Sequence, residues 1–219
     1  MYDVTSRALL RVLELRSLKV EHLSSLGLNQ DLLDYLRRQN IVHLDRGALC
    51  VVDPVRLAIE AVKLGADVEV ASELLTWRDF EGLCVEALRG HGYEVVAPFR
   101  FKVEGKKYEV DVVAHRKGVL LCVDCKHWKM KRGQKSKVKD ATTSHFDKCA
   151  KLALSADLLR RTGLEVRKGS YAVPVIVTLM DLGFKGPLNG VCVVPIYKFN
   201  NFLLELEAHV DELSCVTTR

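Results

Sequence analysis

Two consecutive apolar runs that carry charged residues place the strongest constraint on the fold of this chain. The runs are YEVDVVA, residues 108–114, and GVLLCVDCK, residues 118–126. Side chains alternate between the two faces of a strand, so each run predicts a strand with acidic groups on one face. Buried charges are costly unless they pair or bind a metal ion. We therefore expect Asp111, Asp124 and Lys126 to converge, with two carboxylates that can bind a hard divalent cation.

The surrounding pattern predicts an α/β domain with a mixed sheet. Residues 77–96 begin with a strongly amphipathic helix that ends at Gly90 and Gly92, and Glu81 lies at the edge of its apolar stripe. The expected apolar face of this helix comprises Trp77, Phe80, Leu83, Cys84, Ala87 and Leu88. The other expected elements are a strand at 99–103, a helix at about 140–161, strands at 171–180 and 190–199, and a closing helix at 200–213.

The first 66 residues predict a separate, smaller α+β domain that resembles a winged helix. Helices are expected at residues 4–16 and 29–39, with a short apolar stretch at 20–26 between them, a hairpin at 41–52 and a further helix through Leu64. The boundary is expected after residue 66, which leaves residues 67–219 as the second domain. The second helix carries two acids and two arginines, so DNA binding and protein docking both remain open for this domain.

The positive charge is concentrated in one part of the chain. The net charge is +5, yet residues 100–140 hold thirteen Lys/Arg against five Asp/Glu, and KHWKMKRGQKSKVK from Lys126 to Lys139 has seven basic residues and no acid. Such a run suits a polyphosphate backbone through Coulomb attraction and counterion release. The same composition also occurs in ordinary solvated loops, so the run alone leaves both interpretations open.

The acidic helix edge and the two charged strands resemble the PD-(D/E)XK nuclease superfamily. The resemblance rests on Trp77-Arg78-Asp79-Phe80-Glu81, on Asp111 and on Asp124-Cys125-Lys126, covers about residues 72–205, and is nearest to the Mrr-like and archaeal Holliday-junction-resolvase branches. It implies a restriction-endonuclease-like mixed central sheet flanked by helices. It also implies Mg²⁺-dependent hydrolysis of DNA phosphodiester bonds, with Mn²⁺ as a substitute, in repair, recombination or restriction.

The resemblance also implies a role for each matching residue. Glu81, Asp111 and Asp124, with the main-chain carbonyl of Cys125, would bind the metal ion, and Lys126 would orient the attacking water. Two positions depart from the family pattern. Asp124 stands where these branches usually carry glutamate, which shortens the reach by one methylene, and Val110 stands at the place of the family's proline.

The nucleic-acid contacts are expected on and around the basic run, which we interpret as a loop that grips the flanking backbone. The expected contact residues are His127, Trp128, Lys129, Lys131, Arg132, Lys135, Lys137, Lys139 and Lys148. Since many relatives cut both strands as dimers, the resemblance also predicts a homodimer. Backbone contacts do not distinguish DNA from RNA, so RNA stays open.

Three other interpretations compete with the nuclease. A zinc site at Cys122 and Cys125 is disfavoured because residues three apart on a strand face opposite ways. A non-catalytic DNA-binding or regulatory protein could use the same fold as a platform, but the complete set of acids and lysine favours the enzyme. A winged-helix transcription regulator would need a basic recognition helix, which the nearly neutral first domain lacks.

Composition limits the cellular setting. The chain is 48% hydrophobic and 28% charged, which is typical of a folded, core-forming protein. No run of about 18 apolar residues is present, so no membrane span or signal peptide is expected and a cytoplasmic location is predicted. The seven cysteines are dispersed and odd in number, which predicts reduced thiols.

Overall fold

The computed structural model describes residues 4–127, 134–210, 213 and 216–219. The chain divides into two compact units, Met1–Phe80 and Glu81–Arg219, and the division falls inside a single helix, α5 (Trp77–Gly90). Each unit is described by itself below. The domain boundary expected after residue 66 precedes α4 and stays a prediction.

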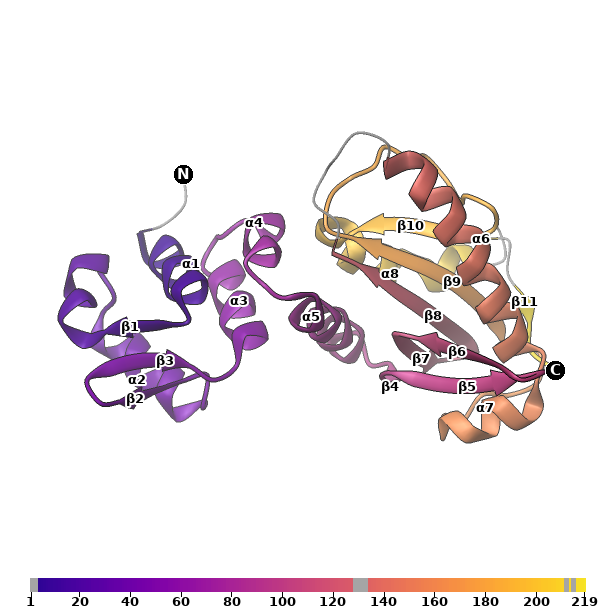
Figure 1. Cartoon of the computed structure of the whole chain (residues 1–219), viewed down its shortest axis with the longest axis horizontal. Coiled ribbons are helices and arrows are strands. Elements are labelled where there is room, and N and C mark those ends of the chain that lie inside the picture. Colours follow the sequence, from indigo (N-terminus) through magenta and orange to yellow (C-terminus); the bar gives the residue numbers. More distant parts are fainter. Residues whose placement is uncertain (1–3, 128–133, 211–212, 214–215) are drawn as a thin grey trace. The chain divides into compact units, whose positions relative to one another are not determined.

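The N-terminal unit consists of helices around a three-stranded antiparallel sheet of order β1-β3-β2 (Figure 1). Its elements are α1 (Val4–Leu15), β1 (Ser17–Lys19), the 3-10 turns η1 (Val20–His22) and η2 (Ser24–Leu26), α2 (Gln30–Arg38), β2 (Val42–Asp45), β3 (Ala48–Val51), α3 (Pro54–Lys63) and α4 (Val68–Glu73). The stretch at 20–26 thus forms 3-10 turns after a short strand that the sequence did not predict. The winged-helix assignment stays a prediction.

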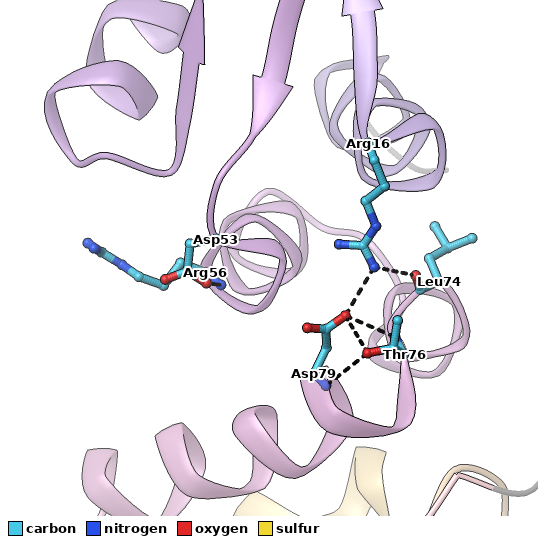
Figure 2. Close-up of polar contacts among 6 residues, drawn as sticks. All are labelled: Arg16, Asp53, Arg56, Leu74, Thr76 and Asp79. Carbon is cyan, nitrogen blue, oxygen red and sulfur yellow. Dashed lines mark hydrogen bonds and ion pairs between the residues drawn. The ribbon is translucent and has the colours of Figure 1, made fainter.

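Side-chain caps fix where the helices of this unit begin. Asn29 accepts a hydrogen bond from the backbone N–H of Leu32 at the start of α2, and Asp53 accepts one from Arg56 N at the start of α3. At the start of α5, Thr76 and Asp79 form a reciprocal capping box, in which each side chain accepts a hydrogen bond from the backbone N–H of the other (Figure 2). Arg16 Nη2 donates to Asp79 Oδ2 and to the carbonyl of Leu74, both at 3.1 Å.

The C-terminal unit contains a six-stranded mixed sheet flanked by helices, as predicted. The strand order is β10-β9-β8-β7-β4, with β11 on β9; β8, β9 and β10 are parallel, and the other pairs are antiparallel. The strands of the sheet are β4 (Glu94–Val96), β7 (Val112–Arg116), β8 (Val119–Lys126), β9 (Tyr171–Thr178), β10 (Cys192–Pro195) and β11 (Val216–Thr217). A separate hairpin pairs β5 (Phe99–Val103) with β6 (Lys106–Val110).

The helices of this unit cover the sheet. They are α5 from Glu81 onward, α6 (Gln134–Ala153), α7 (Ala156–Thr162) and α8 (Ile196–His209); in Figure 1, α6 lies in front of the sheet and α8 behind it. β8 is buried from Val119 to Asp124, as a near-continuous apolar run in a covered sheet requires. A core cluster joins β5, β6, β7, β8 and β9 to α6 and α7 through residues such as Phe101, Val113 and Leu152.

Several predicted elements were wrong in detail. The expected strand at 108–114 is interrupted at Asp111, because β6 pairs with β5 while β7 pairs with β4 and β8. The expected helix at 140–161 is two helices, and Ser155 caps the second by accepting a hydrogen bond from Leu158 N. The closing helix starts at Ile196 instead of residue 200.

The apolar face expected on α5 was wrong at Trp77. Phe80, Cys84 and Leu88 are fully buried, but Trp77 is 57% exposed and the guanidinium of Arg78 lies 5.5 Å from its ring centroid. The described parts of the chain include no helix that is both long and apolar enough to cross a membrane.

Candidate nuclease site

Asp111 and Asp124 face each other across two paired strands. The antiparallel register of β7 and β8 pairs Val112 with Val123, so its continuation by one residue places Asp111 opposite Asp124. Asp111 lies where the chain leaves the β5–β6 hairpin and enters the main sheet. Its Oδ2 accepts a hydrogen bond of 2.8 Å from the backbone N–H of Cys125, which fixes the carboxylate beside the end of β8.

Asp124 is paired with two lysines from different elements. Lys126 Nζ lies 2.6 Å from Asp124 Oδ2, and Lys148 Nζ of α6 lies 3.6 Å from Oδ1. The Asp124 side chain is only 4% exposed. Burial alone would raise the pKa of Asp124, but the charges of Lys126, His145 and Lys148 outweigh burial and hold this pKa below its usual value. Asp124 is therefore a buried carboxylate that stays ionised.

The acids around Asp124 have the opposite tendency. The pKa of Glu81 is raised to about 7 by burial and then by the charges of Asp111, Glu109 and Asp124. Burial and the charge of Asp124 also raise the pKa of Asp111, against the hydrogen bond from Cys125. The site thus concentrates carboxylates near Glu81 and Asp111 with too little positive charge to balance them.

The donor set fits a hard divalent cation in its chemistry. Carboxylates and a main-chain carbonyl are the oxygen ligands that Mg²⁺ prefers, and a cation would relieve the repulsion that raises the pKa of Glu81 and Asp111. Within the described residues, no group of three or more His, Cys, Asp or Glu side chains is already arranged as a metal site.

His145 of α6 lies in this region but is not among the site residues predicted from the sequence. It is fully buried, and its Nε2 lies 2.8 Å from the carbonyl oxygen of Cys122, while Nδ1 is buried without a hydrogen-bond partner among the residues that the structure describes. Thr142, His145, Cys149 and Leu152 are all buried on α6. Their spacing of three and four residues was the signal in the sequence for this buried face of the helix.

The two thiols of the C-x₂-C contact different partners. Cys125 hydrogen-bonds to Cys84 of α5, and Cys149 of α6 hydrogen-bonds to Cys122. These contacts and burial raise the pKa of Cys125 and of Cys149 well above the usual thiol value. The six described free cysteines are therefore mostly buried thiols, as expected for packing residues.

Part of this chain matches the model of a known family. Residues 73–153, which span α5 to α6 and include the four predicted catalytic residues, match the family model Mrr_cat, described as "Restriction endonuclease". Residues 73–153 form a restriction endonuclease-like domain. The predicted family and fold class are confirmed for this domain.

Individual relatives of the restriction endonuclease-like domain are distant. An uncharacterized protein from Archaeoglobus fulgidus is 28% identical over 138 residues, which cover 63% of this chain and 97% of the relative. The solved small subunit of the heterodimeric restriction endonuclease R.BspD6I is 13% identical, with a TM-score of 0.36 and coverage of 71% of this chain and 78% of that chain. A Vibrio cholerae protein is 16% identical with a TM-score of 0.35, and this chain spans 54% of its length. At these TM-scores the structural likenesses carry no information on substrate or assembly.

The expected nucleic-acid contacts of the domain are distributed differently from the prediction. The interpretation of residues 129–139 as one loop was wrong, because α6 begins at Gln134 and includes Lys135, Lys137 and Lys139. Lys137 and Lys139 are exposed on this helix, and His127 is half-buried at the end of β8. The remaining expected contacts are Trp128, Lys129, Lys131 and Arg132, which lie outside the described residues, as does the side chain of Lys135.

Proposed function

We propose that the restriction endonuclease-like domain is a metal-dependent endonuclease that hydrolyses phosphodiester bonds in DNA. The observation that carries the proposal is the meeting of Asp111, Asp124 and Lys126 at the end of paired strands, with Glu81 close enough for its pKa to respond to both aspartates. A set of perturbed acids beside a paired lysine is a typical functional-site arrangement.

In this proposal the carboxylates of Glu81, Asp111 and Asp124 and the carbonyl of Cys125 hold one or two Mg²⁺ ions. A bound divalent ion polarises the phosphate and lowers the pKa of a bound water. Lys126 keeps its proton, since Asp124 outweighs burial and raises the pKa of this lysine. Its ammonium therefore supplies a fixed positive charge that orients the attacking water and stabilises the negative charge developing on the phosphoryl oxygens.

Exposed cations on α6, the helix that also carries Lys148, support DNA as the substrate. Lys137 and Lys139 project from the first turns of α6, and the basic run that precedes α6 extends from Lys129. We assign these lysines to the DNA backbone on one side of the cleaved bond. A homodimer that cuts both strands, and a role in repair, recombination or restriction, belong to the same proposal.

The N-terminal unit is proposed to be a winged-helix module. Support comes from its antiparallel sheet of order β1-β3-β2, in which the β2–β3 hairpin follows α2. The exposed side chains of α2 include Asp31 as well as Arg37 and Arg38. The helix therefore lacks the uniformly basic face that is typical of a DNA recognition helix.

The test is cleavage of labelled duplex, junction, flap and single-stranded DNA with Mg²⁺ or Mn²⁺. Wild type is compared with Asp124→Ala and Lys126→Ala, and with Asp157→Ala and Lys117→Ala as matched controls on exposed side chains. We expect metal-dependent cutting that disappears in the two site variants and persists in the controls. DNA binding by all proteins without cutting would instead support the non-catalytic platform, and RNA included in the panel decides between the two polymers.

A further inference from the structure

The β5–β6 hairpin has one apolar face and one charged face. Phe99, Phe101 and Val110 are buried, and the ring of Phe101 stacks on both Phe99 and Tyr108. The opposite side chains are all exposed, and we call them the outer face of the hairpin: Arg100, Lys102, Lys107 and Glu109. The apolar side explains the fold of the hairpin, but the packing gives no reason for three cations on the outer face.

Lys102 and Lys107 are directly opposite each other in the antiparallel register. Like charges at such positions destabilise a hairpin. Over the described ranges of the chain, neither lysine has an acidic partner within ion-pair distance; the one acid on the outer face, Glu109, is paired with Arg100 at 2.5 Å. An unbalanced pair of this kind is unfavourable in the free protein and becomes favourable when an anion lies across it.

The outer face leads directly into the candidate nuclease site. Lys148 Nζ, which contacts Asp124, donates a hydrogen bond of 3.1 Å to the carbonyl of Glu109, and Asp111 is two residues further along the chain. Lys107 precedes Asp111 by four residues. At about 3.4 Å per residue of extended strand, the Cα of Lys107 lies within about 14 Å of the Cα of Asp111, and Lys102 lies beside Lys107 on the neighbouring strand. This distance corresponds to about four nucleotides at 3.4 Å of helix axis per nucleotide.

We propose that the outer face of the β5–β6 hairpin binds the nucleic-acid backbone, with Lys102 and Lys107 on phosphates about four nucleotides from the bond that the site cleaves. The inference rests on the proposed nuclease function and adds a second DNA-contact surface to it, separate from the basic run before α6. A lysine ammonium is a point charge that contacts phosphates and does not read base edges. This surface therefore adds affinity that is independent of the DNA sequence.

The test measures how DNA binding depends on salt. The double variant Lys102→Gln/Lys107→Gln is compared with wild type on a labelled duplex in EDTA between 50 and 200 mM salt. Each phosphate contact contributes about 0.9 to the slope of log affinity against log salt, so the variant is expected to lose about 1.8 in slope. Over this fourfold salt range, its loss of affinity should be about 12-fold smaller than that of wild type.

The matched control is Lys117→Gln/Lys168→Gln. These two exposed lysines lie just before β8 and β9, at the opposite end of these strands from Asp124 and Lys126. The control has the same charge change and should keep the wild-type slope. The melting temperature separates binding from folding, because removing the like-charge pair should leave the hairpin variant as stable as wild type or more stable.

Neutral methylphosphonates placed three to five nucleotides from the cleaved bond supply the positional test. They should weaken binding by wild type and leave the hairpin variant unaffected. An unchanged salt slope in the hairpin variant, or equal slopes in both double variants, overturns the inference. Failure of the proposed function has a different outcome, since wild type would then cut none of the DNAs, whatever the salt slope of the hairpin variant. A wild type that cuts DNA, with an unaltered slope in the hairpin variant, refutes only the second contact surface.

Discussion

Lys148 places its ammonium nitrogen 3.6 Å from Oδ1 of Asp124, although it was expected only as a DNA contact from the sequence. The other oxygen of the same carboxylate is held by Lys126. The side chain of Lys126 is 26% exposed and that of Lys148 is 21% exposed, so the charge of Asp124 balances two partly buried cations. Both ammonium groups are thereby held at the proposed site.

Replacing Asp124 by asparagine should destabilise the metal-free protein. The substitution leaves two ammonium groups without their counter-charge, and breaking a buried ion pair costs about 3–5 kcal/mol. Because both lysines retain some contact with water, we expect about 2 kcal/mol, measured by urea denaturation in EDTA. Asp157→Asn, which changes a 71% exposed side chain paired with Arg160, should cost less than about 0.5 kcal/mol. Equal effects of the two substitutions would contradict the central role of Asp124.

Replacing Glu81 by glutamine should stabilise the metal-free protein while abolishing cleavage. The folded-state pKa of Glu81 is about 7 against an ordinary value of 4.5, so ionisation costs stability as pH rises from 4.5 to 7. The glutamine variant lacks this cost. After allowance for the solvent that reaches this half-buried group, we expect a gain of about 1 kcal/mol at pH 8 in EDTA.

The control for Glu81 is Glu86→Gln on the same helix. Glu86 is paired with Arg89 at 3.1 Å and is 41% exposed, so its loss should change stability by less than about 0.5 kcal/mol and leave cleavage intact. A Glu81→Gln protein that is less stable than wild type would indicate a structural role for this acid.

The sequence predicted the end of β8 correctly because the run is long and almost continuously apolar. In any strand formed by these residues, Asp124 and Lys126 share a face. Charged side chains in such an apolar strand are costly to bury unless they pair with each other or bind a ligand. Asp111 was harder. No Gly or Pro marks a break at this position, and alternation within a segment does not reveal which strand it pairs with on either side. The change of partner from β5 to β8 depends on tertiary structure.

The basic segment and Trp77 show two further limits of sequence patterns. Lysine and glutamine have good helix propensity, so residues 134–139 join α6 even though their charge suggested a loop. Trp77 fits the apolar stripe of α5 by spacing, but it is the first residue of the helix, and spacing does not tell how far the covering elements extend. Lys148 and His145 needed the packing of α6 on β8 before their neighbours were known.

Tyr93→Phe should stabilise the protein, most of all at high pH. The Tyr93 ring is 4% exposed and its hydroxyl is buried with no hydrogen-bond partner among the described residues. Burial, followed by the charge of Glu207, raises the pKa of Tyr93 to about 12. Removing an unsatisfied hydroxyl should add about 1 kcal/mol at pH 8.

The gain from Tyr93→Phe should increase above pH 10. There the unfolded tyrosine loses its proton while the folded one retains it, so the wild type loses stability as pH rises from about 10 to 12. Denaturation at pH 8 and pH 10.5 measures the difference. Tyr35→Phe, at a tyrosine that is 36% exposed, should be close to neutral at pH 8. A constant gain at both pH values would mean that the Tyr93 hydroxyl reaches water.

Asp79→Ala should cost more stability than the loss of an ordinary helix cap. Asp79 accepts hydrogen bonds from Thr76 N and Thr76 Oγ1 and pairs with Arg16, all through Oδ2 (Figure 2). A cap contributes about 1 kcal/mol, and the partly buried ion pair should add about 1 kcal/mol more. Asp53→Ala is the matched control, because Asp53 caps α3 through Arg56 N and should cost only about 1 kcal/mol. The cycle Arg16→Ala, Asp79→Ala and the double variant isolates the ion pair by urea denaturation. A coupling energy near zero would show that the capping box alone holds the start of α5, the helix that carries Glu81.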